Sequence, residues 1–184
     1  MTQYVNVIPT AGGVGLTTLM TAVAMRLENE QESVTFDMST EDYYDTVALL
    51  GLPTPHAAQV SFGNAEFGDI ETHGDWHIKG WSKRGSYNAP GLNIGFVSSS
   101  YASLRRASTL SHTWHAAVLW QLPDAALGER DVQSVLGPNV RLILNRYMPD
   151  VQRKCDAGLF ASHPFSLLFS TVVDNVIDVI REGK

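Results

Sequence analysis

The stretch of sequence that decides the fold is residues 4–18, which read YVNVIPTAGGVGLTT. Residues 4–8 are rich in β-branched side chains and are followed by Pro9, a pattern that predicts a short buried strand. The glycines at positions 12, 13 and 15 oppose both helix and strand, so they predict a loop. Over residues 17–30 apolar side chains recur at intervals of three and four, which predicts a helix. The stretch therefore predicts a strand, a glycine loop and a helix in succession.

The rest of the chain continues this alternation. Residues 33–36 predict a second strand, and a strand–helix–strand unit of this length is a crossover between parallel strands. Further predicted elements are helices at 43–50, 101–111 and 171–182, and strands at 92–97, 116–120 and 140–145. The alternation predicts an α/β fold, namely a doubly wound, mostly parallel sheet with helices on both faces.

The domain organisation follows from length and composition. A chain of 184 residues matches the size of one domain, so we expect a single domain over 1–184. The segment 53–90 is rich in glycine, histidine and aromatic residues and shows no clear period. We therefore expect this segment to be an insertion or an irregular region.

Composition narrows the classes of partner and compartment. The chain carries 19 acidic and 13 basic side chains, a formal net charge of −6, so a nucleic-acid partner is not expected. The sequence shows no transmembrane stretch and no signal peptide at its start, and Cys155 is the only cysteine, so we expect a cytoplasmic protein. The predicted helix 171–182 lacks the basic polar face that anionic lipids attract, so membrane association is expected only through a partner.

The glycine loop has the composition and the setting of a phosphate-binding loop. Such a loop uses backbone amides and the positive end of the following helix to hold phosphate oxygens. In this setting the run resembles the deviant Walker A motif of the ParA/MinD family of P-loop ATPases, whose pattern reads KGGVGKTT where residues 11–18 here read AGGVGLTT. The resemblance implies a Rossmann-like P-loop NTPase fold. It also implies a vestigial nucleotide loop made of Thr10, Ala11, Gly12, Gly13, Val14, Gly15, Leu16, Thr17 and Thr18.

Other segments extend the resemblance. Residues 34–39 (VTFDMS) resemble the second strand of the family and the start of its switch I, and residues 49–52 (LLGL) resemble the segment that follows. Residues 118–123 (VLWQLP) resemble the Walker B strand. Residues 142–146 (LILNR) are similar to a later strand, which implies that Asn145 lies on the side of the nucleotide base.

Four charged positions of the family pattern carry neutral residues in this chain. Ala11 stands in place of the signature lysine and Leu16 in place of the lysine that touches the β- and γ-phosphates. Ser39 stands in place of the second aspartate of switch I, and Gln121 in place of the Walker B aspartate. Removing one preorganised charge-stabilising group costs a factor of about 10²–10³ in rate, so we expect hydrolysis to be lost and assign no catalytic residue.

The resemblance also limits the cofactors. Thr17 and Asp37 are retained, and they would be metal ligands only if Mg²⁺ were bound. No cofactor is expected, although the glycine backbone and Thr17 leave weak binding of ATP with Mg²⁺ open. Three basic residues elsewhere, Lys79, Lys83 and Arg84, could supply the missing charge.

These observations predict a ParA/MinD-like pseudo-ATPase that acts as a cytoplasmic scaffold or adaptor. It would position or assemble a larger machine for secretion, pilus formation, polysaccharide synthesis or DNA partition. The expected partners are proteins, in a homodimer or heterodimer through the face that carries the P-loop, and aspartate at Val14 or Leu16 is expected to disrupt that assembly. The alternative is an active or weakly active ATPase of DNA partition or cellular positioning.

Two other readings of the sequence are weaker. Two histidine pairs, 73 with 77 and 112 with 115, have spacings that suit zinc on a helix, but no cysteine or carboxylate cluster accompanies them. Aromatic and basic residues alternate between 76 and 87, which suits stacking on single-stranded nucleic acid. The acidic net charge favours a protein contact there, since tryptophan, tyrosine and arginine are enriched at interface centres.

Overall fold

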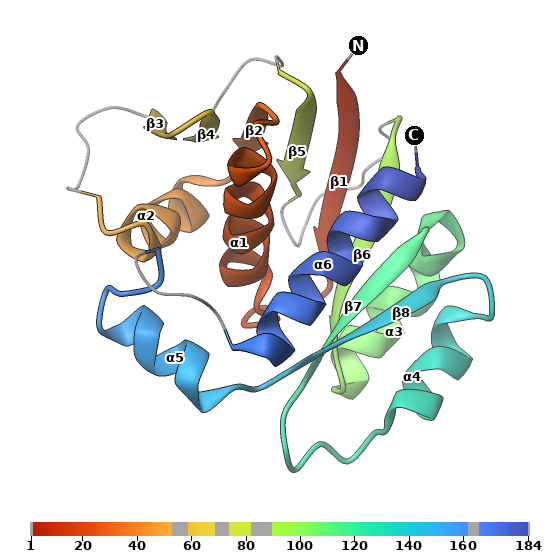
Figure 1. Ribbon diagram of the computed structural model, residues 1–184. Helices are drawn as coiled ribbons and strands as arrows, with labels where there is room; N and C mark the ends of the chain where they lie inside the picture. Colours follow the sequence, from red (N-terminus) through yellow and green to blue (C-terminus); the bar gives the residue numbers. More distant parts are fainter. Residues whose placement is uncertain (1, 53–58, 69–73, 82–89, 162–165, 184) are drawn as a thin grey trace.

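The architecture is a single twisted sheet with helices on its two faces, seen in a computed structural model that describes residues 2–52, 59–68, 74–81, 90–161 and 166–183 (Figure 1). The described strands form an eight-stranded sheet in the order β3-β4-β2-β5-β1-β6-β7-β8. Neighbouring strands are parallel except β3 and β4, which are antiparallel. The strands are β1 (Gln3–Pro9), β2 (Val34–Asp37), β3 (Gln59–Phe62), β4 (Ala65–Gly68), β5 (Trp76–Gly80), β6 (Leu92–Ser98), β7 (Ala116–Gln121) and β8 (Arg141–Arg146).

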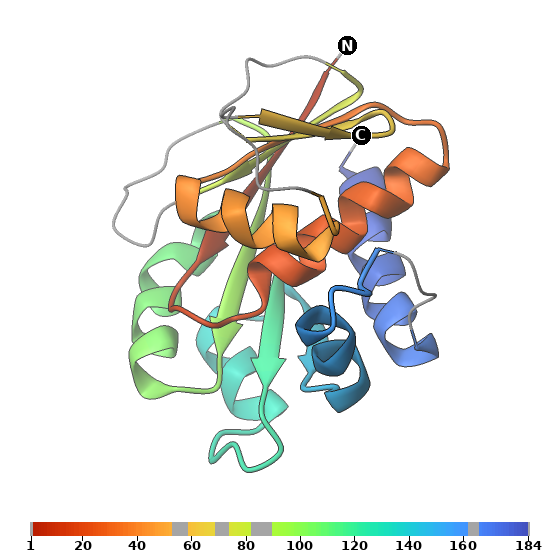
Figure 2. The same cartoon turned by 90° about the vertical axis from the view of Figure 1, so that its left-hand side faces the viewer.

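Helices cover both faces of the sheet, as the sequence predicts. The helices are α1 (Leu16–Asn29), α2 (Thr40–Leu49), α3 (Tyr101–Leu110), α4 (Glu129–Leu136), α5 (Pro149–Asp156) and α6 (Leu167–Glu182). In Figure 1 α1 and α6 lie in front of the strands and α3 and α4 behind them, and Figure 2 shows α3 on the side of the strands opposite to α1 and α6. The predicted doubly wound α/β fold is confirmed.

The core is divided by the sheet into two layers, and β1 contributes to both. Val5 and Val7 pack in the layer under α1 and α6, whereas Ile8 packs in the layer under α3 and α4. Because parallel strands are buried on both faces, β1 reads as a nearly continuous apolar run. The carboxyl ends of the parallel strands all lie at one edge of the sheet, the lower edge in Figure 1, and the glycine loop lies there with them.

The expectation that 53–90 is an insertion or an irregular region is wrong for the parts of it that the structure describes. Those parts supply β3, β4 and β5, and β5 pairs with both β1 and β2 near the middle of the sheet. In β5 the side chains of Trp76 and Ile78 are buried in the α1 layer. The alternating residue His77 is also buried, and its Nδ1 lies 2.9 Å from Thr35 Oγ1. Because polar residues alternate with apolar ones in β5, the sequence pattern did not identify it as a central strand.

Among the described residues, no helix is both long enough and apolar enough to cross a lipid bilayer.

Candidate functional site

The glycine loop is anchored at its start by Thr10. The backbone N–H of Thr10 donates to Phe96 O (2.9 Å), and its hydroxyl donates to the same oxygen (3.0 Å). The hydroxyl also hydrogen-bonds Ser103 Oγ, and the residue is buried. The loop therefore leaves β1 from a point that is fixed to both β6 and α3.

Two glycines shape the loop, each for a different reason. Gly13 and Gly15 have φ of +65° and +70°, a conformation that residues with a Cβ rarely adopt. A Cβ at Gly15 would lie 3.1 Å from Trp120 Cε3 and 3.3 Å from Asn145 Nδ2, whereas a Cβ at Gly13 would meet nothing within 4 Å. Gly15 therefore brings the backbone close to two side chains, whereas at Gly13 the conformation of the turn is what favours glycine.

The start of α1 offers backbone donors to an anion. Gly15 is its N-cap residue and provides no side-chain cap, and the first turn contains no acidic residue. Gly12 and Gly13 are exposed. The first N–H groups of a helix have no partner within the helix, and the helix dipole places partial positive charge there. The loop thus keeps the backbone features of a phosphate-binding site.

The apolar side chains of the loop face the core to different degrees. Val14 is 3% exposed and belongs to the α1 layer of the core, while Ala11 and Leu16 are half-buried and pack against that layer. Val14 is therefore not part of an exposed face, and Val14→Asp would disturb the core before it disturbed an interface. The side chain of Leu16 packs against the core and carries no positive charge that could contact a phosphate.

Thr17 and Ser39 meet at a residue that the sequence analysis missed. Thr17 Oγ1 donates to Asp42 Oδ1 (2.8 Å), and Ser39 Oγ donates to Asp42 Oδ2 (2.6 Å). Ser39 is also the N-cap of α2, where its Oγ accepts from the N–H of Asp42 (3.3 Å). A serine followed three residues later by an acidic residue is a typical helix start, and this pattern could have identified Asp42.

Asp37 is paired with a lysine. Lys79 Nζ lies 2.9 Å from Asp37 Oδ2, and the Lys79 ammonium also lies 5.5 Å from the centroid of the Trp81 ring. The Asp37 side chain is 19% exposed and that of Lys79 is 44% exposed. Of the three basic residues considered as substitutes for the missing lysines, Lys79 thus contacts Asp37, while Lys83 and Arg84 lie outside the described residues.

Gln121 lies apart from Asp37. Gln121 ends β7 and Asp37 ends β2. In the sheet these two strands lie on opposite sides of β1, with β6 between β1 and β7 and β5 between β1 and β2. The strands that pair with β1 are β5 and β6, and their last residues are Lys79 and Gly80 in β5, and Val97 and Ser98 in β6. Neither of these two strands ends in an acidic residue, and the carboxylate that contacts Thr17 belongs to Asp42 of α2.

Two of the four paired histidines, His77 and His115, contact other residues of the fold, and His112 is exposed. His115 Nδ1 accepts from the backbone N–H of Asn93 (3.1 Å), and His77 contacts Thr35 as described above. His73 lies outside the described residues. Within the part of the chain that the structure describes, no group of three or more histidine, cysteine, aspartate or glutamate side chains is placed to hold a metal ion.

A pocket of about 210 Å³ lies on the other side of the loop, next to the ends of β7 and β8. Its walls come from the loop, from these strand ends, and from α5 and α6. Its lining residues are Gly13, Gly15, Thr18, Trp120, Asn145, Arg146, Tyr147, Met148, Val151, Gln152, Cys155 and Phe169. The rings of Trp120 and Tyr147 meet edge to face, with their centroids 6.3 Å apart.

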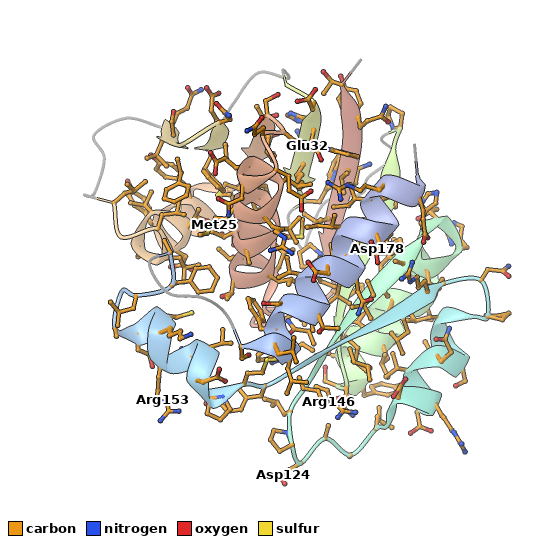
Figure 3. The ribbon with its side chains drawn as sticks, viewed as in Figure 1. Met25, Glu32, Asp124, Arg146, Arg153 and Asp178 are labelled. Carbon is orange, nitrogen blue, oxygen red and sulfur yellow. The ribbon has the colours of Figure 1, made fainter. Side chains whose placement is uncertain are left out.

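Asn145 is the notable polar group of the pocket. It is 2% exposed, and its Oδ1 has no hydrogen-bond partner among the described residues. A buried acceptor without a donor is rare in folded proteins and is satisfied by a ligand or by water. Arg146, at the end of the same strand, lies at the lower edge of the molecule in Figure 3.

Cys155 lines the same pocket from α5 and is half-buried. Burial raises the pKa of its thiol above the usual value, and the negative charge of Asp156 acts in the same direction. A raised pKa keeps the sulfur protonated at neutral pH, so Cys155 is a weakly nucleophilic wall of the pocket.

The residues present fit the base of a nucleotide better than they fit a magnesium-bound triphosphate. The pocket offers flat apolar walls and one unpaired acceptor, which suit a planar ring with an N–H donor. On the phosphate and metal side, Leu16 packs against the core, Thr17 donates to Asp42, and Asp37 is paired with Lys79. The arrangement can bind and orient a ring, and it places little positive charge at the loop for phosphates.

Comparisons with known proteins agree with this geometry at the level of the fold. The sequence matches no protein-family profile and no curated protein. Several solved structures are similar to the chain over almost its whole length. The septum site-determining protein MinD of Pyrococcus horikoshii, in complex with Mg-ADP, has a TM-score of 0.71 at 12% identity, with 96% of each chain covered.

Two further structures place the similarity in the same group. A plasmid partition protein of Borrelia burgdorferi bound to AMPPNP has a TM-score of 0.68 at 10% identity, with 99% of each chain covered. The MinC:MinD cell division complex of Aquifex aeolicus has a TM-score of 0.70 at 13% identity, with 96% of each chain covered.

The sheet and its glycine loop thus define a P-loop NTPase fold of the α/β class. Within that class, the structures that this chain resembles include MinD proteins and a plasmid partition protein. At these identities the likeness concerns the fold, and the activity has to be argued from the residues.

Proposed function

We propose that this protein is a pseudo-ATPase that acts as a cytoplasmic scaffold or adaptor and assembles or positions a larger machine through protein contacts. The machine would serve secretion, pilus formation, polysaccharide synthesis or DNA partition. The fold supports this kind of role, because similar structures include a cell division complex and a plasmid partition protein. Any contact with a membrane would be made through a partner.

The observation that carries the proposal is the pairing of Lys79 with Asp37. Asp37 is the one acidic switch residue retained in the resemblance, and an ammonium of the same chain lies 2.9 Å from its carboxylate. Phosphoryl transfer depends on positive charge that is free to stabilise the transferred phosphate. Here the charge contacts a carboxylate of the chain itself, and Leu16 adds none.

Exposed apolar side chains near the loop support a role in protein contacts. Tyr101, Leu122 and Tyr147 are 77%, 53% and 38% exposed, and they follow β6, β7 and β8 at the sheet edge that carries the loop. Leu167 and Leu168, at the start of α6, are 83% and 70% exposed. Clustered exposed apolar residues mark interaction sites more often than isolated ones do. We propose that this edge forms a homodimer or heterodimer.

The first test is phosphate release by the purified protein with Mg²⁺ and ATP. We expect no turnover above that of the Ala11→Asp control, which places a negative charge in the loop. Restoring both ammonium groups with Ala11→Lys and Leu16→Lys should raise the affinity for ATP at least tenfold, because charge-assisted contacts to phosphate would return. Turnover by the unmodified protein that the Ala11→Asp control abolishes would instead establish an active ATPase.

The second test addresses the contact surface. Sedimentation velocity of the purified chain should show self-association that Leu122→Asp weakens. The matched control is Val135→Asp on α4, an apolar residue that is 36% exposed and lies away from the loop edge. Equal sedimentation of the two variants would count against a homodimer through the loop edge.

A further inference from the structure

The edge of the sheet at β3 is a surface that the proposed scaffold role does not use. We propose that two copies of this chain pair antiparallel through β3 (Gln59–Phe62), so that their two sheets join into one. β3 stands at one end of the strand order, whereas the loop edge is formed by the carboxyl ends of the parallel strands (Figure 1). The inference therefore goes beyond the proposed function and does not depend on it.

The hydrogen bonds between β2 and β4 show which way the backbone groups of β4 point. Val34 N–H donates to Asn64 O (3.2 Å), and Met38 N–H donates to Gly68 O (3.2 Å). Successive residues of a strand direct their N–H and C=O groups to opposite neighbours, so the even-numbered residues from 64 to 68 bond to β2. The odd-numbered residues of β4 therefore direct these groups to its other neighbour, β3.

The same alternation assigns the backbone groups of β3. Phe62 pairs with Ala65 and Val60 pairs with Phe67, and these are the hydrogen-bonded pairs of the hairpin. Ser61 lies between them, so its N–H and C=O groups point away from β4 toward the outer edge of the sheet. Ser61 is exposed, and no strand of the described chain lies beyond β3 to bond these two groups.

A residue with one outward donor and one outward acceptor is complementary to a copy of itself. About a two-fold axis at Ser61, each N–H donates to the C=O of the other copy, which is the hydrogen-bonded pair of an antiparallel ladder. In this register Val60 of one copy lies opposite Phe62 of the other. Both side chains are half-buried and pack against the α1 layer of the core, so the pairing continues that apolar layer from one copy into the next.

The two edge strands of the sheet differ in charge. β8, at the opposite edge, begins with Arg141 and ends with Arg146. β3 has no charged residue, and residues 46–65 contain no lysine, arginine, aspartate or glutamate. Charged side chains on an edge strand oppose its pairing with another chain. Two copies paired antiparallel through β8 would bring arginines together, whereas two copies paired through β3 bring no like charges together.

The test is sedimentation velocity of the full chain over a range of concentrations. It is carried out on the Leu122→Asp variant, so that the loop edge does not contribute, and this variant should form a concentration-dependent dimer. Adding Ser61→Pro removes one outward N–H from each copy and no bond of the hairpin, so the dimer Kd should rise about tenfold or more. Adding Ser61→Thr keeps the N–H and should leave the Kd within about threefold. A Leu122→Asp chain that is monomeric at every concentration would overturn the proposal.

A second variant keeps the proposal testable if the proline disturbs the fold, which urea denaturation measures. Ser61→Lys retains every backbone group and places two like charges opposite each other in the pair. The dimer Kd of this variant should also rise about tenfold or more. If Ser61→Lys dimerises as the Leu122→Asp parent does, the inferred contact is wrong.

Amide hydrogen exchange tests the pairing without a substitution on β3. The amide of Ser61 should exchange more slowly at protein concentrations above the dimer Kd than below it, because only pairing gives it an acceptor. The amides of Val60 and Phe62 bond within the hairpin and should exchange at the same rates at both concentrations. Exchange of the Ser61 amide that does not depend on concentration would overturn the proposal.

The outcome is separable from the scaffold role. Self-association that Leu122→Asp abolishes and Ser61→Pro leaves unchanged would support the loop edge and overturn pairing through β3. Dimers that Ser61→Pro dissociates and Leu122→Asp does not would support pairing through β3 and count against a homodimer through the loop edge. A chain that stays monomeric alone and accepts a strand of a different protein at β3 would also contradict the pairing of two copies.

Discussion

The two sides of the glycine loop differ in how their polar groups are satisfied. On the pocket side, Asn145 Oδ1 is buried and has no partner in the described structure. On the switch side, Thr17 donates to Asp42, and Asp37 is paired with Lys79. Buried polar groups in folded proteins are generally hydrogen-bonded, so an unpaired one points to a missing ligand and a paired one does not. The pocket side thus holds a buried acceptor that the described chain leaves unbonded, whereas the polar groups of the switch side are bonded within the chain.

The largest expected effect tests whether the loop that joins the two sides is part of the core. Val14→Asp places a carboxylate at a position that is 3% exposed, and we expect a loss of about 3–5 kcal/mol in the free energy of unfolding. Leu16→Asp is the matched control, because Leu16 is half-buried and an acidic residue in the first turn of a helix is favourable. Its expected loss is about 1–2 kcal/mol. Urea denaturation measures both.

Equal losses in these two variants would contradict the assignment of Val14 to the core. If Val14→Asp kept its stability and lost only self-association, the original expectation that Val14 contributes to an interface would be restored. The two measurements together therefore separate folding from assembly at neighbouring positions of one loop.

The second prediction compares two glycines of the same loop. Gly15→Ala and Gly13→Ala share the cost of a residue with a Cβ at positive φ, about 1 kcal/mol. Gly15→Ala should cost about 1–2 kcal/mol more, because its Cβ would press on Trp120 and Asn145. Thermal unfolding measures the difference. Equal losses of stability in the two variants would show that a Cβ at position 15 does not press on Trp120 and Asn145.

The sequence alone was sufficient to predict the glycine loop and the strand and helix on either side of it. The order of strand, glycine loop and helix over residues 4–30 was predicted because apolar periodicity and glycine content are local properties. The resemblance of residues 142–146 to a family strand singled out Asn145, and its place beside a nucleotide base stays a prediction. The pocket also contains Trp120, and residues 118–123 had been matched to a Walker B strand that the topology places two strands away from β1.

The sequence did not predict the ion pair between Lys79 and Asp37 on the switch side of the loop. Lys79 and Asp37 are 42 residues apart, and they meet because β5 inserts between β1 and β2. β5 has only five residues, and polar residues alternate with apolar ones in it. The sequence pattern therefore did not identify it as a buried strand. The helices α4 and α5, of eight residues each, were missed for a similar reason, since short helices carry few periodic positions.

The third prediction concerns the ion pair between Asp37 and Lys79 on the switch side of the loop. Lys79→Ala removes the partner of Asp37, and because the pair is partly exposed the loss of stability should stay below about 1 kcal/mol. The freed carboxylate should give the variant weak Mg²⁺ binding that calorimetry does not detect in the unmodified protein. Arg141→Ala is the control, since it breaks the exposed pair with Glu182 far from the loop. A gain of Mg²⁺ binding in Arg141→Ala as well would show that the effect is not local.

The smallest expected effect concerns Cys155, whose thiol reports on the pocket side. Burial, aided by Asp156, raises its pKa, so its alkylation rate should keep rising at pH values where free cysteine has levelled off. Because the folded state holds this proton more tightly than the unfolded state does, the group lowers stability as the pH rises past the pKa of the unfolded thiol. A small molecule that fills the pocket should slow alkylation, whereas Mg²⁺ alone should not, because Thr17 and Asp37 on the switch side are bonded to Asp42 and Lys79. Mass spectrometry follows the reaction at the only cysteine of the chain, with the urea-unfolded protein as the reference. Protection by Mg²⁺ alone would contradict the difference between the two sides of the loop, since the metal would then bind near Cys155 on the pocket side.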